Sequence, residues 1–178
     1  MREETTEKRL LQSPAEWELY LDFIQMYFKK RGIVNPVVVE LGVYENAQKR
    51  FYEERLGATH IGIDNRVWGE PPDIVGDTHN VETLWRLRNM LNGRTVNLLF
   101  IDGSHDYESA RIDYEFYEPF AQNIVAFHDV CEPACGCSRL WQELFNDIRP
   151  WAKVVFYRFG PGAPNLVFRM GIGLIIKQ

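Results

Sequence analysis

Four side chains able to carry acid–base or metal chemistry lie in one short stretch of the chain: Asp102, His105, His128 and Asp129. Asp102 follows the apolar run "VNLLFI", and Asp129 follows "NIVAFH", which ends in His128. If these runs are adjacent parallel strands joined by a helix, the four side chains meet at the carboxyl edge of a sheet. Two carboxylates and two imidazoles crowd together at little cost only when a cation, a proton or a substrate lies among them.

The two aspartates predict a site for a divalent ion. Carboxylates at the ends of neighbouring strands can share one ion with oxygen-rich coordination, which favours Mg²⁺ or Mn²⁺ over zinc. His128 is predicted as a further ligand or as a residue that orients one, and a histidine hydrogen-bonded to the backbone is an equally good interpretation. His105 has an ordinary pKa near ~6.5 and is predicted to be a general base.

The three cysteines allow a competing zinc interpretation. Together with His128 they have the spacing His-x2-Cys-x3-Cys-x-Cys, at Cys131, Cys135 and Cys137. A zinc site usually draws on a second ligand pair, and none with zinc-like spacing stands elsewhere in the sequence. Reduced thiols in a loop are therefore the preferred interpretation.

A second group of residues predicts a nucleoside site. Glu40 and Gly42 lie at the end of the run "VVVELG", Asp64 ends "HIGID", and Asp77 ends "DIVGD". Asp64 is placed to accept hydrogen bonds from ribose hydroxyls, Asp77 to meet an adenine amino group, and Gly42 to let the backbone approach a ligand. The dinucleotide signature G-x-G-x-x-G is absent, and Glu45 near the predicted start of a helix disfavours a pyrophosphate. The alternative is that such acids only cap helices.

The elements that must position these residues alternate between strand and helix. Apolar residues at helical spacing predict helices, and short β-branched runs predict strands buried on both faces. The last two strands have no helix between them, so the linker "GPGAPN" predicts an antiparallel hairpin. The predicted fold class is α/β: a doubly wound, mostly parallel seven-stranded sheet with a C-terminal antiparallel hairpin and a reversed strand at or near its edge. The predicted helices span about residues 14–31, 46–56, 82–91, 107–117 and 138–148, and the predicted strands span 37–42, 60–64, 73–77, 96–101, 123–127, 153–159 and 171–177.

Composition limits the classes of function. The 178 residues predict one domain over residues 13–178, preceded by a flexible charged arm over residues 1–12. The net charge of −5 argues against a general binder of nucleic acid or of an anionic membrane. No signal-peptide core and no membrane-length apolar run is present in the sequence, so we expect a cytoplasmic protein.

Several of these motifs resemble those of one enzyme family. The predicted sheet, the segment "ELG" after the first strand, the acids after the second and third strands and the terminal hairpin are similar to class I S-adenosylmethionine-dependent methyltransferases. Within that family, "LLFIDGSHDYESARIDYEFY", "IVAFHDV" and "GIGLI" resemble a branch of small-molecule O-methyltransferases and of proteins named as cephalosporin hydroxylases. The resemblance runs from about residue 37 to the C-terminus.

The resemblance implies a Rossmann-like methyltransferase fold and a role for each candidate residue. Glu40 and Gly42 would flank the methionine part of S-adenosylmethionine, Asp64 its ribose, and Asp77 its adenine. Asp102 would also lie beside the cofactor. With Asp129 it matches positions that hold a magnesium-type ion in metal-dependent relatives, and His105 matches a histidine beside the methyl-transfer site.

Two departures from the family pattern stand out. Relatives place a small residue near position 46, where this chain has Glu45 and Asn46. Metal-dependent relatives often have a carboxylate next to the last ligand, where this chain has His128.

The predicted function is S-adenosylmethionine-dependent methylation of a hydroxyl group on a small molecule, such as a sugar or a natural product, with help from a divalent ion. One alternative is a non-catalytic nucleoside-binding or scaffold protein of the same fold. Another is a metal-dependent hydroxylase or hydrolase that uses the two histidines and two aspartates, because two histidines and one carboxylate can hold iron. The short chain leaves little room for a lid, so a homo-oligomer that completes the pocket is also expected.

Overall fold

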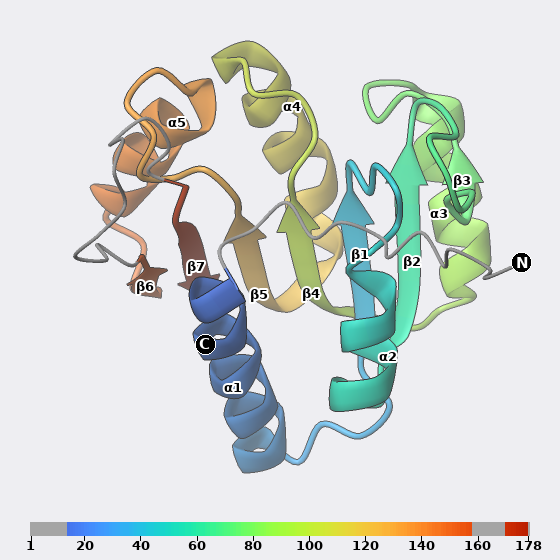
Figure 1. Ribbon diagram of the computed structural model, residues 1–178, viewed down its shortest axis with the longest axis horizontal. Helices are drawn as coiled ribbons and strands as arrows, with labels where there is room; N and C mark the ends of the chain where they lie inside the picture. Colours follow the sequence, from blue (N-terminus) through green and yellow to red (C-terminus); the bar gives the residue numbers. More distant parts are fainter. Residues whose placement is uncertain (1–13, 158–169, 178) are drawn as a thin grey trace, which may run out of the picture.

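A computed structural model describes residues 14–157 and 170–177. The predicted arm, residues 1–12, and the predicted hairpin linker lie outside these described residues. Within the described residues, seven strands form one sheet in the order β3-β2-β1-β4-β5-β7-β6 (Figure 1). The strands are β1 Val37–Leu41, β2 Thr59–Asp64, β3 Ile74–Val75, β4 Val96–Ile101, β5 Ala121–Phe127, β6 Ala152–Phe156 and β7 Ile172–Ile176. The predicted doubly wound, mostly parallel sheet is therefore confirmed.

The reversed strand of the sheet is β7, which lies between β5 and β6 and is antiparallel to both. The predicted terminal antiparallel pair is confirmed, and the reversed strand is second from the edge. Every residue of β7 is buried, whereas β6 is only partly buried. The continuous apolar run of β7 suits an internal strand, and Gly173 lets the ring of Trp141 lie against it, where a side chain would collide.

Helices cover both faces of the sheet. α1 (Pro14–Arg31) and α2 (Lys49–Leu56) lie on the face turned toward the viewer in Figure 1. α3 (Val81–Leu91), α4 (Tyr107–Tyr117) and α5 (Gly136–Phe145) pack on the opposite face, and a short 3₁₀ helix, η1 (Glu118–Phe120), follows α4. Each layer encloses its own apolar core, so the sheet separates two cores.

Three predicted boundaries need correction. α2 begins at Lys49 and not at residue 46, because Tyr44 and Asn46 have left-handed backbone angles (φ 48° and 59°) that a helix cannot contain. α5 spans residues 136–145 and not 138–148, so Cys135 is its N-cap and Cys137 lies inside the helix. β3 shortens to two residues. Glu45 therefore precedes α2 by four residues and lies outside its first turn, so it does not act on that helix's N-terminal dipole as predicted.

The carboxyl ends of β1, β2, β4 and β5 all lie at the same edge of the sheet, the upper edge in Figure 1. This arrangement follows from right-handed crossovers between parallel strands, and it brings the loops after these strands together. Within the described residues, no helix is long and apolar enough to cross a membrane.

Candidate functional site

A cavity of about 720 Å³ opens at the carboxyl edge of the sheet. Cavities of this size hold a nucleoside-sized ligand together with part of a second small molecule. The loops after β1, β2, β3, β4 and β5 all contribute to its wall. Every predicted site residue except Glu40 lines it: Gly42, Asp64, Asp77, Asp102, His105, His128 and Asp129. The tertiary structure thus brings together residues that are spread over most of the sequence.

Glu40 lies behind the cavity wall. Its side chain is 0 % exposed and lies on the face of the sheet covered by α1 and α2, where its Oε2 is 2.7 Å from Nε2 of His60. Burial raises the pKa of Glu40, and the hydrogen bond with His60 opposes that shift. The ring of Tyr52 stacks on His60 at 5.5 Å. Glu40 therefore supports the cavity from the core and does not form its surface.

Gly42 has a structural task in addition to the role predicted for it. Its φ is 82°, in the left-handed region, and a Cβ atom on it would collide with the backbone of Asp102 and Gly103. Gly42 N also donates to Ile63 O at 2.8 Å, which fixes the turn after β1. The glycine is required because the loop after β4 crosses directly over it. It brings the loops after β1 and β4 to one cavity wall.

Asp64 connects the loops after β1 and β2. Its Oδ2 accepts a hydrogen bond from Tyr44 N at 3.0 Å, and its Oδ1 accepts one from Arg66 N at 3.2 Å. Each carboxylate oxygen has a second lone pair, so Asp64 keeps acceptor capacity toward the cavity. The residue is mostly buried and lines the cavity, which is the placement that hydroxyl recognition needs.

An aromatic wall lies beside Asp64, and the sequence analysis missed it. The rings of Tyr44 and Trp68 are 5.3 Å apart, and the guanidinium of Arg66 lies 4.3 Å from the Trp68 ring. All three residues line the cavity. Flat aromatic and guanidinium faces suit a planar or sugar-like ligand. The only sequence signal was two aromatic residues in predicted loops, which by itself does not place them together.

A second missed group surrounds Asp77. Asp77 accepts a hydrogen bond from His79 N at 2.9 Å, and His79 Nε2 lies 3.4 Å from Oδ1 of Asp113 on α4. Burial raises the pKa of Asp113. Asp77, His79 and Asp113 all line the cavity. The sequence predicted a helix over residues 107–117 but no role for Asp113, because its polar surroundings depend on the tertiary structure.

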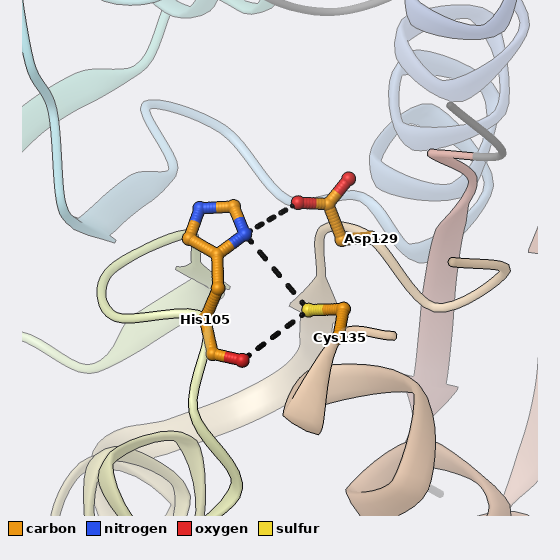
Figure 2. A group of neighbouring side chains, drawn as sticks. All are labelled: His105, Asp129 and Cys135. Carbon is orange, nitrogen blue, oxygen red and sulfur yellow. Dashed lines mark hydrogen bonds and ion pairs between the residues drawn. The ribbon is translucent and has the colours of Figure 1, made fainter. Parts of the chain in front are cut away.

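The four residues predicted to converge, Asp102, His105, His128 and Asp129, do meet at one rim. His105 Nδ1 is 2.8 Å from Asp129 Oδ2, and its side chain is 61 % exposed toward the cavity. Figure 2 shows the other ring nitrogen of His105 pointing away from Asp129 and Cys135. Because Nδ1 donates to Asp129, Nε2 is the nitrogen left to accept a proton. The hydrogen bond to Asp129 raises the pKa of His105 above its ordinary value.

His128 lies on the buried side of the same rim. Its Nδ1 is 3.0 Å from Asp102 Oδ1 and 3.4 Å from Asp129 Oδ1, aligned as a hydrogen bond with neither. Burial opposes charge on this ring, but the contacts with Asp102 and Asp129 together outweigh burial and raise the pKa of His128 to about 10. Burial likewise opposes charge on Asp129, and contacts with His105 and His128 hold the pKa of Asp129 well below its ordinary value. The rim is therefore a network of alternating imidazole and carboxylate groups.

The donor atoms do not form the oxygen-rich site predicted for Mg²⁺. Among the described residues, the three potential ligands that lie within 4.8 Å of one another are His105, Asp129 and Cys135 (Figure 2). The predicted trio of Asp102, His128 and Asp129 does not form such a group. A nitrogen, an oxygen and a sulfur suit a softer metal than magnesium. Cys131 and Cys137 lie outside this group.

The comparisons with known proteins identify the fold. No protein-family model and no curated protein matches the sequence. Among solved structures, an O-methyltransferase from Bacillus cereus in complex with SAH matches with a TM-score of 0.58 and 14% identity, over 96% of this chain and 84% of that chain.

Two further structures show the range of proteins that share this fold. Magnesium protoporphyrin IX methyltransferase from Synechocystis PCC 6803 with bound SAM matches with a TM-score of 0.56 and 10% identity, over 92% of this chain and 81% of that chain. The mycinamycin methyltransferase MycE, in complex with Mg, SAH and mycinamycin VI, matches with a TM-score of 0.56 and 14% identity. That match covers 86% of this chain and 48% of MycE, so the chain spans about half of MycE. The protein thus has the Rossmann-like fold of the class I S-adenosylmethionine-dependent methyltransferases.

Proposed function

We propose that this protein is an S-adenosylmethionine-dependent methyltransferase that acts on a hydroxyl group of a small molecule. The observation that carries the proposal is that two sets of residues with different chemistry line one cavity. Asp64, Asp77 and the aromatic wall of Tyr44 and Trp68 form one set, and the His105–Asp129 pair forms the other. The first suits a nucleoside without phosphates, and the second suits a group that must lose a proton.

The residues that would hold the cofactor fit it in their chemistry. Asp64 offers acceptor lone pairs to ribose hydroxyls, and Asp77 offers a carboxylate to an adenine amino group. The Gly42 turn keeps the nearby wall free of a side chain. When bound, S-adenosylmethionine supplies an activated methyl group, so the protein has to supply position and a nucleophile.

His105 provides the proton acceptor for the nucleophile. An acceptor hydroxyl beside Nε2 would give its proton to the imidazole, and bound S-adenosylmethionine would supply the methyl group from its sulfonium and leave as SAH. Asp129 orients the ring through Nδ1 and stabilises the imidazolium that forms. A small molecule with a hydroxyl near an apolar or sugar-like body matches the volume and the aromatic wall of the cavity.

Ligand binding tests the proposal. S-adenosylmethionine and SAH should raise the melting temperature and give saturable heats in calorimetry, and NAD should do neither. Asp64→Ala removes an acceptor for two hydroxyls, so SAH affinity should fall by about 1.5–3 kcal/mol. Binding of NAD as tight as that of SAH, or no binding of either, would overturn the proposal. Binding of SAH with no turnover on a broad panel of hydroxyl acceptors would instead favour a non-catalytic protein of the same fold.

A further inference from the structure

We propose that the His128 side chain takes the place of a divalent ion between Asp102 and Asp129, so that the acceptor rim of this protein works without a bound metal. The inference rests on the proposed function only in treating the rim as the acceptor site. The MycE structure, which has a similar fold, contains Mg.

The first observation behind this proposal is the position of the His128 ring. The ring is 5 % exposed, it comes from the end of β5, and it packs 6.4 Å from the ring of Phe100 on β4. From there its Nδ1 reaches oxygens of both carboxylates, at 3.0 Å and 3.4 Å. One atom shared between two carboxylates does the bridging that an ion would otherwise do. An ion could bridge the same oxygens only if the buried ring moved away.

The second observation is that both carboxylate oxygens of Asp129 contact histidine side chains. Its Oδ2 is 2.8 Å from His105 Nδ1, and its Oδ1 is 3.4 Å from His128 Nδ1. Both oxygens therefore already face imidazole nitrogens. Mg²⁺ needs near-octahedral coordination by oxygens at about 2.0–2.1 Å and gives up water reluctantly. A carboxylate held by two imidazoles is a poor ligand for such an ion.

The consequence is a positioning role for His128. It holds the oxygen of Asp129 that does not contact His105, so it sets the orientation of the carboxylate that in turn orients His105. His128 does not reach the acceptor itself in this scheme. The three residues form a chain that runs from the buried β5 end to the exposed Nε2 of His105.

Metal binding by the wild-type protein tests the proposal without any acceptor. The SAH-loaded protein is titrated with MgCl₂ in a calorimeter, and Mn²⁺ is followed by the loss of its free-ion EPR signal. The expected result is no saturable binding at millimolar concentrations, and no stoichiometric metal in the purified protein by elemental analysis. Saturable Mg²⁺ or Mn²⁺ binding that disappears in Asp129→Asn would overturn the proposal. Stoichiometric zinc that disappears in Cys135→Ser would overturn it too.

A gain-of-binding variant makes the test sharper. His128→Glu puts a third carboxylate beside Asp102 and Asp129, which restores an oxygen ligand set. We expect this variant to bind Mn²⁺ at least about tenfold tighter than wild type, and to be stabilised against heat by added Mg²⁺. Gln142→Glu, an added acid at an exposed position of α5, is the matched control and should gain nothing. Equal gains in both variants would show nonspecific charge effects and count against the proposal.

These experiments distinguish a failure of the proposed function from a failure of the proposal about His128. If SAH does not bind, the proposed function fails, and the metal titration of the unliganded protein still reports on His128. If SAH binds and the wild-type protein also binds Mg²⁺ at the rim, the proposed function is retained, but the proposal that His128 replaces the ion is wrong. Should His128→Glu not fold, the wild-type titration alone decides.

Discussion

At the scale of single residues, the rim is a chain of charged and polar contacts that ends at one exposed nitrogen. His128 contacts Asp102 and Asp129, Asp129 contacts His105, and Nε2 of His105 is left toward the cavity. Each contact sets the orientation of the next group. This order explains why a partly exposed histidine can have a defined tautomer, because its Nδ1 is committed to a carboxylate that is itself held.

The His105→Ala variant should lose turnover and keep the cofactor. General-base help is worth about 10²- to 10⁴-fold, so kcat should fall by about that factor while SAH affinity stays within a few-fold. His105→Gln keeps a hydrogen-bonding group but accepts no proton at neutral pH, so it should be nearly as impaired. Steady-state kinetics with an identified acceptor and SAH calorimetry check the two effects. Wild-type turnover in His105→Gln would reduce His105 to a structural residue.

Asp129 should set the pH at which turnover falls. Only neutral His105 accepts a proton, and the hydrogen bond that His105 donates to Asp129 raises the pKa of His105 above its ordinary value. The rate should therefore fall as pH drops through a pKa that lies above about 6.5. Asp129→Asn removes the charge, so the inflection should move to lower pH. An inflection that stays in place would show that Asp129 does not tune His105.

At the scale of elements, the cavity depends on how closely two loops cross. The turn after β1 passes directly under the loop after β4, and Gly42 is the contact point. Within the described residues, Gly93 has the same φ of 82° but nothing within 4 Å of the place where a Cβ would lie. A comparison of alanine substitutions at these two glycines therefore separates two costs. One is the strain of a left-handed backbone, and the other is the collision of the new Cβ with a neighbouring loop.

Gly42→Ala should destabilise the protein far more than Gly93→Ala. A left-handed non-glycine residue costs about 1–2 kcal/mol, which is the whole effect expected at Gly93. At Gly42 the new Cβ also collides with the backbone of the neighbouring loop, so the total should exceed about 3 kcal/mol. Urea denaturation of the two variants measures the difference. Equal losses would mean that the loops after β1 and β4 move apart freely.

At the scale of the whole molecule, one sheet separates two apolar cores, and α1 closes one of them. Trp17, Tyr20, Leu21 and Ile24 of this helix are almost fully buried against the sheet. Trp17 packs edge-on against Tyr52 and Phe100, and the Tyr20 hydroxyl lies 3.2 Å from that of Tyr52. The N-terminal helix is thus a structural layer on the side of the sheet that carries Glu40.

Trp17→Ala should lower the free energy of unfolding by about 3–5 kcal/mol, because it leaves a large cavity in a closed core. Leu19→Ala, on the exposed side of the same helix, is the matched control and should change stability by less than about 0.5 kcal/mol. Chemical denaturation followed by circular dichroism should show one transition for both variants. A similar small loss in each would show that α1 is not an integral layer of the fold.

The local features of this protein could be predicted from its sequence. Alternating β-branched runs and amphipathic stretches predicted the order of strands and helices, because their periods differ and need no knowledge of distant partners. Acids at the ends of strands predicted which edge carries the site, since parallel strands put their carboxyl ends together. Asp64, Asp102, His105 and Asp129 were found in this way, and all of them line the cavity.

The contacts between these residues could not be predicted from the sequence, because they depend on long-range packing. β7 lies between β5 and β6 because long-range pairing buried its apolar run, a choice that no local period encodes. Glu40 pairs with Gly62, two residues before Asp64, so Glu40 lies in the core behind the wall, whereas Asp64, at the carboxyl end of β2, lines the cavity. The placement of His128 between two carboxylates followed from the register of β4 against β5, in which Ile101 pairs with Phe127. Such contacts depend on distances between separate strands, and those distances exist only in the folded chain.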